Sequence, residues 1–395
     1  MANADYSFRQ LLEIDSCTNC QLCADACPAT SAAQNGELSA VWRMNGLKHI
    51  LRGRTGLFHK FIKNKRPSEE ALKHLSDTSF RCTLCGNCQE VCPAGIRLRN
   101  LWISLRQDMV HSNVYPKKID MIGENMEETH NVFGEDNGER AEWVEDMRDP
   151  PANGYIKDKA EVVYFTGCTA SYFPLAQNIP ISLVEVLDAG RVDFTLLGEE
   201  EWCCGFPLLG AGLMDMFEQF KNHNIEVIRE KGAREILFAC PSCYQMWKEY
   251  YPKEFKITHA SQFLANLIKK NRIPLKELPL KVTYHDPCDL GRGARVFDEP
   301  RDVIQAIPGV TLEELPHNKN TCLCCGGGGN LEMTDAKLAA DIAKTKIDEV
   351  LKTGADAVIT SCQQCVRTMA TYVRRNKIPV KVMDITELVR NAVKG

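Results

Sequence analysis

Short apolar runs alternate with longer amphipathic stretches through residues 159–395. The runs Val162–Phe165 and Val282–Tyr284 have the β-branched and aromatic content of buried strands, whereas residues 213–231 and 335–353 have helical periodicity. Each half ends in a further strand-like run and a helical stretch, ITHASQFLANLI in the first half and VMDITELVRNAV in the second. Alternating strands and helices predict an α/β lobe with a parallel sheet, and the repetition predicts two such lobes.

The N-terminal part of the chain has a different pattern. Residues 1–104 have apolar positions at helical spacing and little strand-like alternation, which predicts a small, mostly helical domain. An acidic connector follows at residues 105–158 and ends in the breaker string DPPANG. We therefore expect a multidomain α+β chain in which two α/β lobes, at residues 159–275 and 276–395, follow the helical domain and its connector.

Composition narrows the class of protein. The chain of 395 residues has a net charge of −4, which excludes the strongly basic field of a general nucleic-acid binder. It has no apolar run long enough for a transmembrane segment, and its start, MANADYSFRQLLEID, lacks the pattern of a signal peptide. We expect a cytoplasmic protein that reaches the cytoplasmic membrane face, if at all, through a partner. The 19 cysteines stand in spaced groups, which in a reducing compartment indicates metal or redox chemistry.

The first eight cysteines form two runs of the form C-x2-C-x2-C-x3-C-P, the spacing of bacterial two-cluster ferredoxins. Three close thiolates can hold three corners of one cubane 4Fe-4S cluster, while the fourth cysteine points to the other cluster. The spacing therefore predicts two cubanes with crossed ligands, one on Cys17, Cys20, Cys23 and Cys92 and the other on Cys82, Cys85, Cys88 and Cys27. Two structural zinc sites are the alternative for the same cysteines.

Each predicted lobe contains five cysteines in the order C, CC, C-x2-C, and corresponding cysteines lie 120 to 122 residues apart. The two groups are Cys168, Cys203, Cys204, Cys240 and Cys243, and Cys288, Cys324, Cys325, Cys362 and Cys365. A cubane needs four ligands, and adjacent cysteines do not readily take neighbouring corners. The pattern therefore indicates a non-standard cluster or a redox-active thiol pair beside a cluster. A zinc site with a spare cysteine and a vicinal disulfide remain open.

The pattern Cx34CCx35CxxC followed by Cx35CCx36CxxC resembles the paired CCG domains of heterodisulfide reductases, and with the ferredoxin-type module in front the chain resembles their single-chain type over residues 8–395. The resemblance implies a noncubane 4Fe-4S cluster in each lobe, held by that lobe's five cysteines. It further implies that the two noncubane clusters face one another and split a disulfide, while the cubanes deliver electrons one at a time.

The resemblance leaves the activity and the partners open. Similar CCG pairs occur in iron–sulfur subunits of glycolate and lactate oxidizing enzymes and of complexes of the benzoyl-CoA reductase type, so the alternative is an electron-relay subunit without its own substrate. No flavin, nicotinamide or quinone motif is recognisable in the sequence. We therefore expect other subunits of a redox complex as partners: an HdrA-like flavoprotein, a ferredoxin or hydrogenase module, or a membrane cytochrome.

Three features lie outside these ligand sets. Cys322, the nineteenth cysteine, is interpreted either as a thiol near the active face or as a buried spare cysteine. His285 is interpreted either as a proton donor to a departing thiolate or as a hydrogen-bond partner of a sulfide or carbonyl. The glycines at 326–329 indicate close backbone approach to a cluster or room for substrate.

The insert between the two ferredoxin-type runs is basic. Residues 38–68 contain arginines and lysines but no acidic residue, with apolar positions at roughly helical spacing. Arg52, Arg54 and Lys60 are therefore a candidate docking element for an acidic partner, and a solvated helical face is the alternative.

Overall fold

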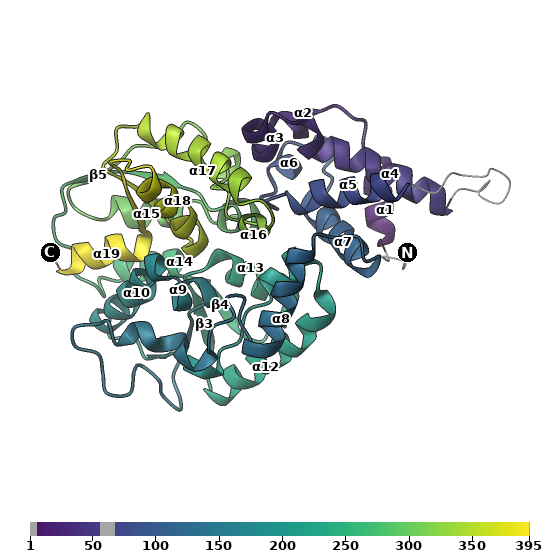
Figure 1. Cartoon of the computed structure of the whole chain (residues 1–395). Coiled ribbons are helices and arrows are strands. Elements are labelled where there is room, and N and C mark those ends of the chain that lie inside the picture. The colour runs from purple at the N-terminus through teal and green to yellow at the C-terminus, as the bar shows by residue number, and fades with distance from the viewer. Residues whose placement is uncertain (1–5, 56–67, 395) are drawn as a thin grey trace. The chain divides into compact units, whose positions relative to one another are not determined.

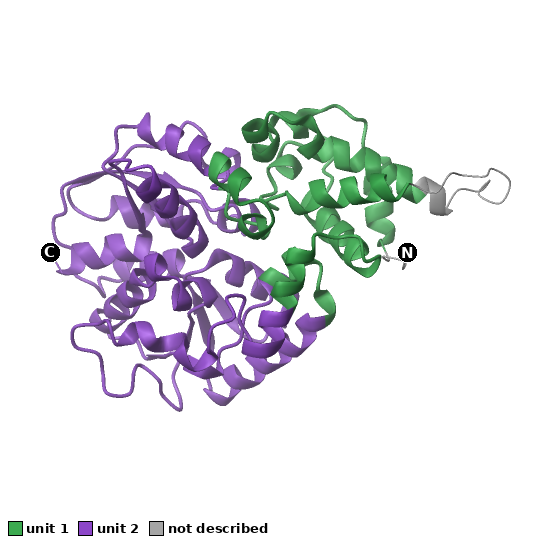
Figure 2. Cartoon of the chain, viewed as in Figure 1, with its two compact units in different colours: residues 1–123, 207–215, 326–342 green, residues 124–206, 216–325, 343–395 purple. Residues whose placement is uncertain are grey.

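The structure is a computed structural model that describes residues 6–55 and 68–394 (Figure 1). The candidate docking element falls outside the described residues, because Lys60 and the side chains of Arg52 and Arg54 are not among them. The chain divides into two compact units, coloured in Figure 2. The first comprises residues 1–123, 207–215 and 326–342, and the second comprises residues 124–206, 216–325 and 343–395. The four domain boundaries drawn from the sequence stay a prediction.

The first unit contains helices and no strand among its described residues. Its N-terminal helices are α1 (Phe8–Asp15), α2 (Leu22–Asp25), α3 (Pro28–Ala33), α4 (Ala40–Thr55), α5 (Glu69–Phe80), α6 (Asn87–Glu90) and α7 (Leu98–His111). Local sequence explains two of the starts: Ser7 forms a capping box with Gln10 before α1, and the Ser68 side chain accepts a hydrogen bond from Ala71 N before α5. α4, α5 and α7 pack together through buried side chains such as Leu47, Leu75 and Trp102, which gives this unit its core.

The second unit contains two four-stranded parallel sheets with the same strand order. The first sheet has the order β2–β1–β3–β4 and is built from β1 (Val162–Phe165), β2 (Phe194–Thr195), β3 (Glu235–Phe238) and β4 (Lys256–His259). The second has the order β6–β5–β7–β8 and is built from β5 (Leu280–His285), β6 (Val310–Leu312), β7 (Ala357–Thr360) and β8 (Lys381–Asp384). The predicted fold class, a helical ferredoxin-type region followed by two α/β lobes, is confirmed. The sequence pattern does not predict β2 and β6, because two or three residues are too few to show a period.

Helices cover these sheets and connect the two lobes. The helices of the first lobe and its entry are α8 (Asp120–Thr129), α9 (Cys168–Tyr172), α10 (Asn178–Ala189), α11 (Phe206–Ala211), α12 (Phe217–Glu230), α13 (Pro241–Tyr250) and α14 (Ala260–Lys269). Those of the second are α15 (Glu299–Gln305), α16 (Leu331–Thr334), α17 (Ala336–Leu351), α18 (Gln363–Arg375) and α19 (Ile385–Lys394). α10 and α19 lie side by side, and α14 packs against α15 (Figure 1). One hydrophobic core therefore runs through both lobes, with Leu183 and Leu264 of the first and Val303 and Leu388 of the second among its members.

The sheet order places a topological switch point in each lobe. The chain leaves β1 for β2 on one side and then crosses to β3 on the other side, and β5, β6 and β7 are related in the same way. In open parallel sheets, ligands bind outside the carboxyl ends of the two strands that flank such a point. The loops after β1 and β3, and after β5 and β7, are therefore the expected ligand sites of the two lobes.

Candidate iron–sulfur sites

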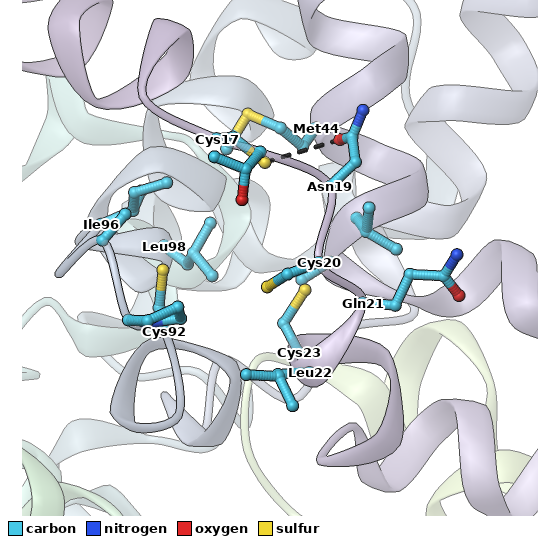
Figure 3. A pocket seen from close by; sticks show the side chains of 15 residues that line it. Cys17, Asn19, Cys20, Gln21, Leu22, Cys23, Met44, Cys92, Ile96 and Leu98 are labelled. Carbon is cyan, nitrogen blue, oxygen red and sulfur yellow. Dashed lines mark hydrogen bonds between the residues drawn. The ribbon is translucent and has the colours of Figure 1, made fainter.

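The first cavity in the helical unit is lined by Cys17, Cys20, Cys23 and Cys92, which are the four cysteines that the spacing predicts as one ligand set. Figure 3 shows sulfur atoms from this loop and the sulfur of Cys92 turned toward the same space. The empty volume of the cavity is ≈ 420 Å³, and Cys20 is exposed at its edge. This site therefore stands at the protein surface.

The second cavity is lined by the other predicted set, Cys27, Cys82, Cys85 and Cys88, and has an empty volume of ≈ 360 Å³. Cys27 and Cys85 are buried, so this site is more enclosed than the first. The side chains of Arg43 and Trp102 also line it.

The two loops have the same backbone conformation. In the first loop, Asn19 and Gln21 have φ values of 58° and 68°, and in the second loop Leu84 and Gly86 have φ values of 54° and 74°. These are the second and fourth positions after the first cysteine of each run. A left-handed conformation costs about 1 kcal/mol at a non-glycine residue, so its repetition indicates that each loop is shaped to wrap around a bound group.

Two buried donors at the second cavity fit a cubane. Arg43 Nε and Trp102 Nε1 are buried, and neither has a hydrogen-bond partner in the protein. Both side chains line the cavity, and the Arg43 guanidinium lies 5.1 Å from the centre of the Trp102 ring. A group with acceptor atoms and negative charge, such as the sulfides and thiolates of a 4Fe-4S cluster, satisfies both N–H groups.

In the first α/β lobe, the five predicted cysteines gather at the switch point. Cys168 begins α9 just after β1, the Cys203–Cys204 pair follows β2, and Cys240 and Cys243 open α13 after β3. All five are buried. A hydrogen bond with Cys203, together with burial, raises the pKa of Cys168 well above its usual value. Hydrogen bonds with Cys203 and Cys243 lower the pKa of Cys204. Thiols that share protons in this way fit a metal site, because a bound metal replaces the protons.

In the second lobe, Cys324, Cys325, Cys362 and Cys365 are buried, and the Sγ atoms of Cys325 and Cys365 are 3.3 Å apart. Ligand atoms of His285, Cys325 and Cys365 all lie within 4.8 Å of one another. The half-buried Cys288 follows β5, and its Sγ faces Oδ1 of Asp289 at 4.0 Å.

The groups around the first lobe's site include a buried ion pair. Arg140 donates a hydrogen bond to Glu201 at 2.9 Å, and both side chains are 1% exposed. The same guanidinium lies 3.8 Å from the Sγ of Cys168. The Glu201 carboxylate also accepts hydrogen bonds from the backbone N–H groups of Thr166 and Gly167, at 2.7 and 2.8 Å. This pair fixes the loop that carries Cys168 and places a positive charge beside its sulfur.

The second lobe has a different set of groups at this place. His285 Nδ1 lies 3.4 Å from the Sγ of Cys322, and Lys346 Nζ lies 3.5 Å from the same sulfur on its other side. Glu349 connects Lys346 (2.6 Å) to the half-exposed His317 (2.7 Å), so the contacts continue to the surface. Although burial lowers it, the nearby Cys322 sulfur raises the pKa of His285 to about 9.

The two CCG sites are joined by reciprocal contacts inside the second unit. The side chain of Gln363, within the second lobe's C-x2-C motif, donates a hydrogen bond to Thr166 O (2.7 Å) beside Cys168. From the first lobe's C-x2-C motif, Ser242 donates to Asp289 (2.6 Å) beside Cys288. In agreement with this, α13 packs against residues 289–293, and α18 packs against α9. Each motif therefore contacts the ligand loop of the other lobe.

Sequence reasoning missed Arg140, Glu201 and Lys346. A signal existed for Glu201, because it stands two residues before the first CC pair, where Cys322 stands in the second copy. Aligning the two copies would therefore have marked this position as one where the lobes differ. Arg140 lies outside the repeat and had no such signal.

Comparisons with known proteins agree with this architecture. The model of the cysteine-rich CCG domain matches residues 162–248 and 282–370, and that of the 4Fe-4S dicluster domain matches residues 13–96. A dihydromethanophenazine:CoB–CoM heterodisulfide reductase iron–sulfur chain from Methanosarcina mazei is 35% identical over 97% of this chain and 95% of its own length. The chain belongs to this heterodisulfide reductase family.

Other members and relatives of this family match along the whole chain. The corresponding heterodisulfide reductase chain of Methanosarcina acetivorans is 36% identical over 97% of this chain and 95% of its own length. An EtfAB:quinone oxidoreductase of Syntrophomonas wolfei is 27% identical over 98% of this chain but only 59% of its own length. The matched domains identify this heterodisulfide reductase family member as a 4Fe-4S protein with an electron-transfer role. Among its described helices, none has the combined length and apolar character that crossing a membrane requires.

Proposed function

We propose that this chain reduces a disulfide at its paired CCG sites. The observation that carries the proposal is the reciprocal contact between the lobes, in which Gln363 and Ser242 each reach the ligand loop of the other lobe. A disulfide has two sulfurs, so two metal sites held against one another in one core offer one acceptor for each. The reaction takes two electrons and two protons and releases two thiols.

The proposal includes four clusters. Two cubanes lie on the crossed ligand sets in the helical unit, and a noncubane 4Fe-4S cluster in each lobe is held by that lobe's five cysteines. Support comes from the two cavities, each lined by one crossed set, and from the two unpartnered N–H groups at the second. The five clustered thiols in the first lobe support a cluster with more than four cysteine ligands.

Electrons come from a partner subunit. Cys20, at the first cavity, is exposed, whereas the cysteines of the lobes are almost all buried. A redox partner would therefore exchange electrons at the first cubane. An HdrA-like flavoprotein, a ferredoxin or hydrogenase module, or a membrane cytochrome would serve, and the last would hold the chain at the cytoplasmic face of a membrane.

The test is turnover by the anaerobically purified full-length chain with reduced methyl viologen as the electron source. The CoB–CoM heterodisulfide, the substrate named for the Methanosarcina relatives, is the first disulfide to supply. We expect viologen oxidation in step with thiol release. Cys362→Ser should abolish turnover, and Cys20→Ser is the matched control, because it damages only a cubane that viologen can bypass. A chain with complete clusters that reduces no disulfide contradicts the proposal.

The second candidate function is an electron relay without a substrate. It is favoured by the EtfAB:quinone oxidoreductase relative, whose name describes electron exchange between a flavoprotein and a quinone. In that case the chain would exchange electrons with a flavoprotein at a rate unaffected by added disulfides. Stopped-flow mixing with a reduced electron-transferring flavoprotein, with and without the heterodisulfide, distinguishes the two candidates.

A further inference from the structure

Two arginines are fully buried in the helical unit beside the second ferredoxin-type run. Arg43 on α4 is 1% exposed, and Arg106 on α7 is 0% exposed. Neither forms an ion pair with any carboxylate among residues 6–55 and 68–394. Burying an arginine cation without a counter-charge is strongly unfavourable, and the guanidinium stays protonated in proteins. An anion must therefore belong beside them.

The contacts of Arg106 tie it to the second run. Its guanidinium donates to the carbonyl oxygens of Cys82 (2.6 Å) and Ser79 (2.8 Å). It also donates to Gly210 O (2.5 Å) and Gly329 O (2.9 Å) within the same unit. All of these acceptors are neutral carbonyl groups, so the hydrogen bonds position the guanidinium but do not neutralise it.

Arg43 faces the second cavity directly. Two of its N–H groups donate to Thr78 O and Leu38 O, at 3.2 and 3.1 Å, while its Nε–H has no partner and its side chain lines the cavity. The Trp102 N–H is a second unpartnered donor at the same place. A cubane with four thiolate ligands is an anion, and it gains one more negative charge on reduction. Cations and donors held here therefore favour its reduced form.

The first cavity has a different lining. No lysine or arginine is among the residues that line it. The nearest described cation contact is that of the half-buried Lys48, which donates to Cys17 O at 2.9 Å. Because Cys20 is exposed, water and salt screen any charge near this site.

We propose that Arg43 and Arg106 make the second cubane the more easily reduced of the two, so that an electron received at the first cubane passes to the second. The inference rests on the proposed assignment of cubanes to the two crossed ligand sets. One electron leaves the reduced first cubane and enters the oxidised second cubane, and no bond or proton changes. Burial of the second site opposes its reduction, but two fixed charges and two N–H donors, none neutralised by a carboxylate, outweigh it.

The experiment is an anaerobic redox titration of the full chain followed by electron paramagnetic resonance. Cys92→Ser and Cys27→Ser assign the signals to the first and second cubane. In the unmodified chain, the midpoint potential of the second cubane should be the more positive. Arg43→Gln should shift the second potential to a more negative value and leave the first unchanged, while Arg43→Lys, which keeps the charge, should restore most of the shift. Lys48→Gln is the matched control and should leave the second potential unchanged.

Trp102→Phe removes one N–H donor but no charge, so it tests the site even if Arg43→Gln fails to load the second cubane. It should shift the second potential to a more negative value by less than the loss of Arg43 does. A second cubane with the more negative potential in the unmodified chain overturns the inference, as does an unchanged potential in Arg43→Gln. These outcomes are distinct from failure of the proposed function, which would appear as intact clusters without disulfide turnover.

Discussion

Gly329 offers a direct test of how the glycine-rich segment after the second CC pair packs in the helical unit. A Cβ atom added at Gly329 would collide with Cys82 O and lie 2.8 Å from the carbonyl carbon of Thr83. The neighbouring Gly328 is similarly confined, because its added Cβ would lie 2.5 Å from Thr83 O. These glycines therefore permit the close approach of two backbones. The predicted close approach is to the backbone of a ferredoxin-type loop.

The matched control for Gly329→Ala is Gly95→Ala. The two glycines have nearly the same φ, 63° and 65°, so alanine at either position carries the same left-handed strain of about 1 kcal/mol. Nothing lies within 4 Å of a Cβ added at Gly95. At Gly329 the added methyl group overpacks the contact, at about 1–3 kcal/mol, and displaces the carbonyl that accepts from Arg106, at about 1.5–3 kcal/mol.

We therefore expect Gly329→Ala to lower the free energy of unfolding by about 3–6 kcal/mol more than Gly95→Ala does. Anaerobic urea titration of the two variants, followed by circular dichroism and by visible absorbance of the clusters, measures this difference. The spectrum of the second cubane should change in Gly329→Ala, because its Cys82 loop must move. Equal urea midpoints for the two variants, with unchanged cluster spectra, would refute the packing argument.

Three other predictions test separate parts of the chain. Cys92→Ser should remove the cubane signal of the first run, and Cys27→Ser that of the second; loss at the mutated residue's own run would contradict the crossed pairing. Arg140→Gln leaves Glu201 buried and unpaired and should destabilise the fold by about 3–5 kcal/mol, and adding Glu201→Gln should recover part of this in a double-mutant cycle. Burial lowers the pKa of His259 from 6.5 to about 3, so the unfolded chain binds a proton that the folded chain does not. Stability should therefore fall with pH below 6.5, by about 1 kcal/mol between pH 6.5 and 5.5, and His259→Asn should reduce that fall without loss of the helix cap.

The sequence was sufficient for features that depend on local spacing. Strand-like runs directly before Cys168 and Cys240 placed these cysteines at strand ends, because in parallel sheets such runs lead into ligand loops. The close spacing of Cys17, Cys20 and Cys23 likewise places three sulfurs on one loop. The role of Arg106 had no local signal, because its carbonyl partners at Gly210 and Gly329 lie 104 and 223 positions away in the chain.

The internal repeat also set a limit on prediction, because it treats the two CCG sites as equivalent. The backbone is repeated, as the identical strand orders show, since strand and helix periods determine it. The groups around the ligands are not repeated: Glu201 bonds to the backbone beside Cys168, whereas its counterpart Cys322 contacts His285 and Lys346. A fixed ion pair at one site and a chain of proton-carrying groups at the other give two sites with the same ligand types but different surroundings. Any account of how the lobes share one reaction must therefore start from this difference between the sites.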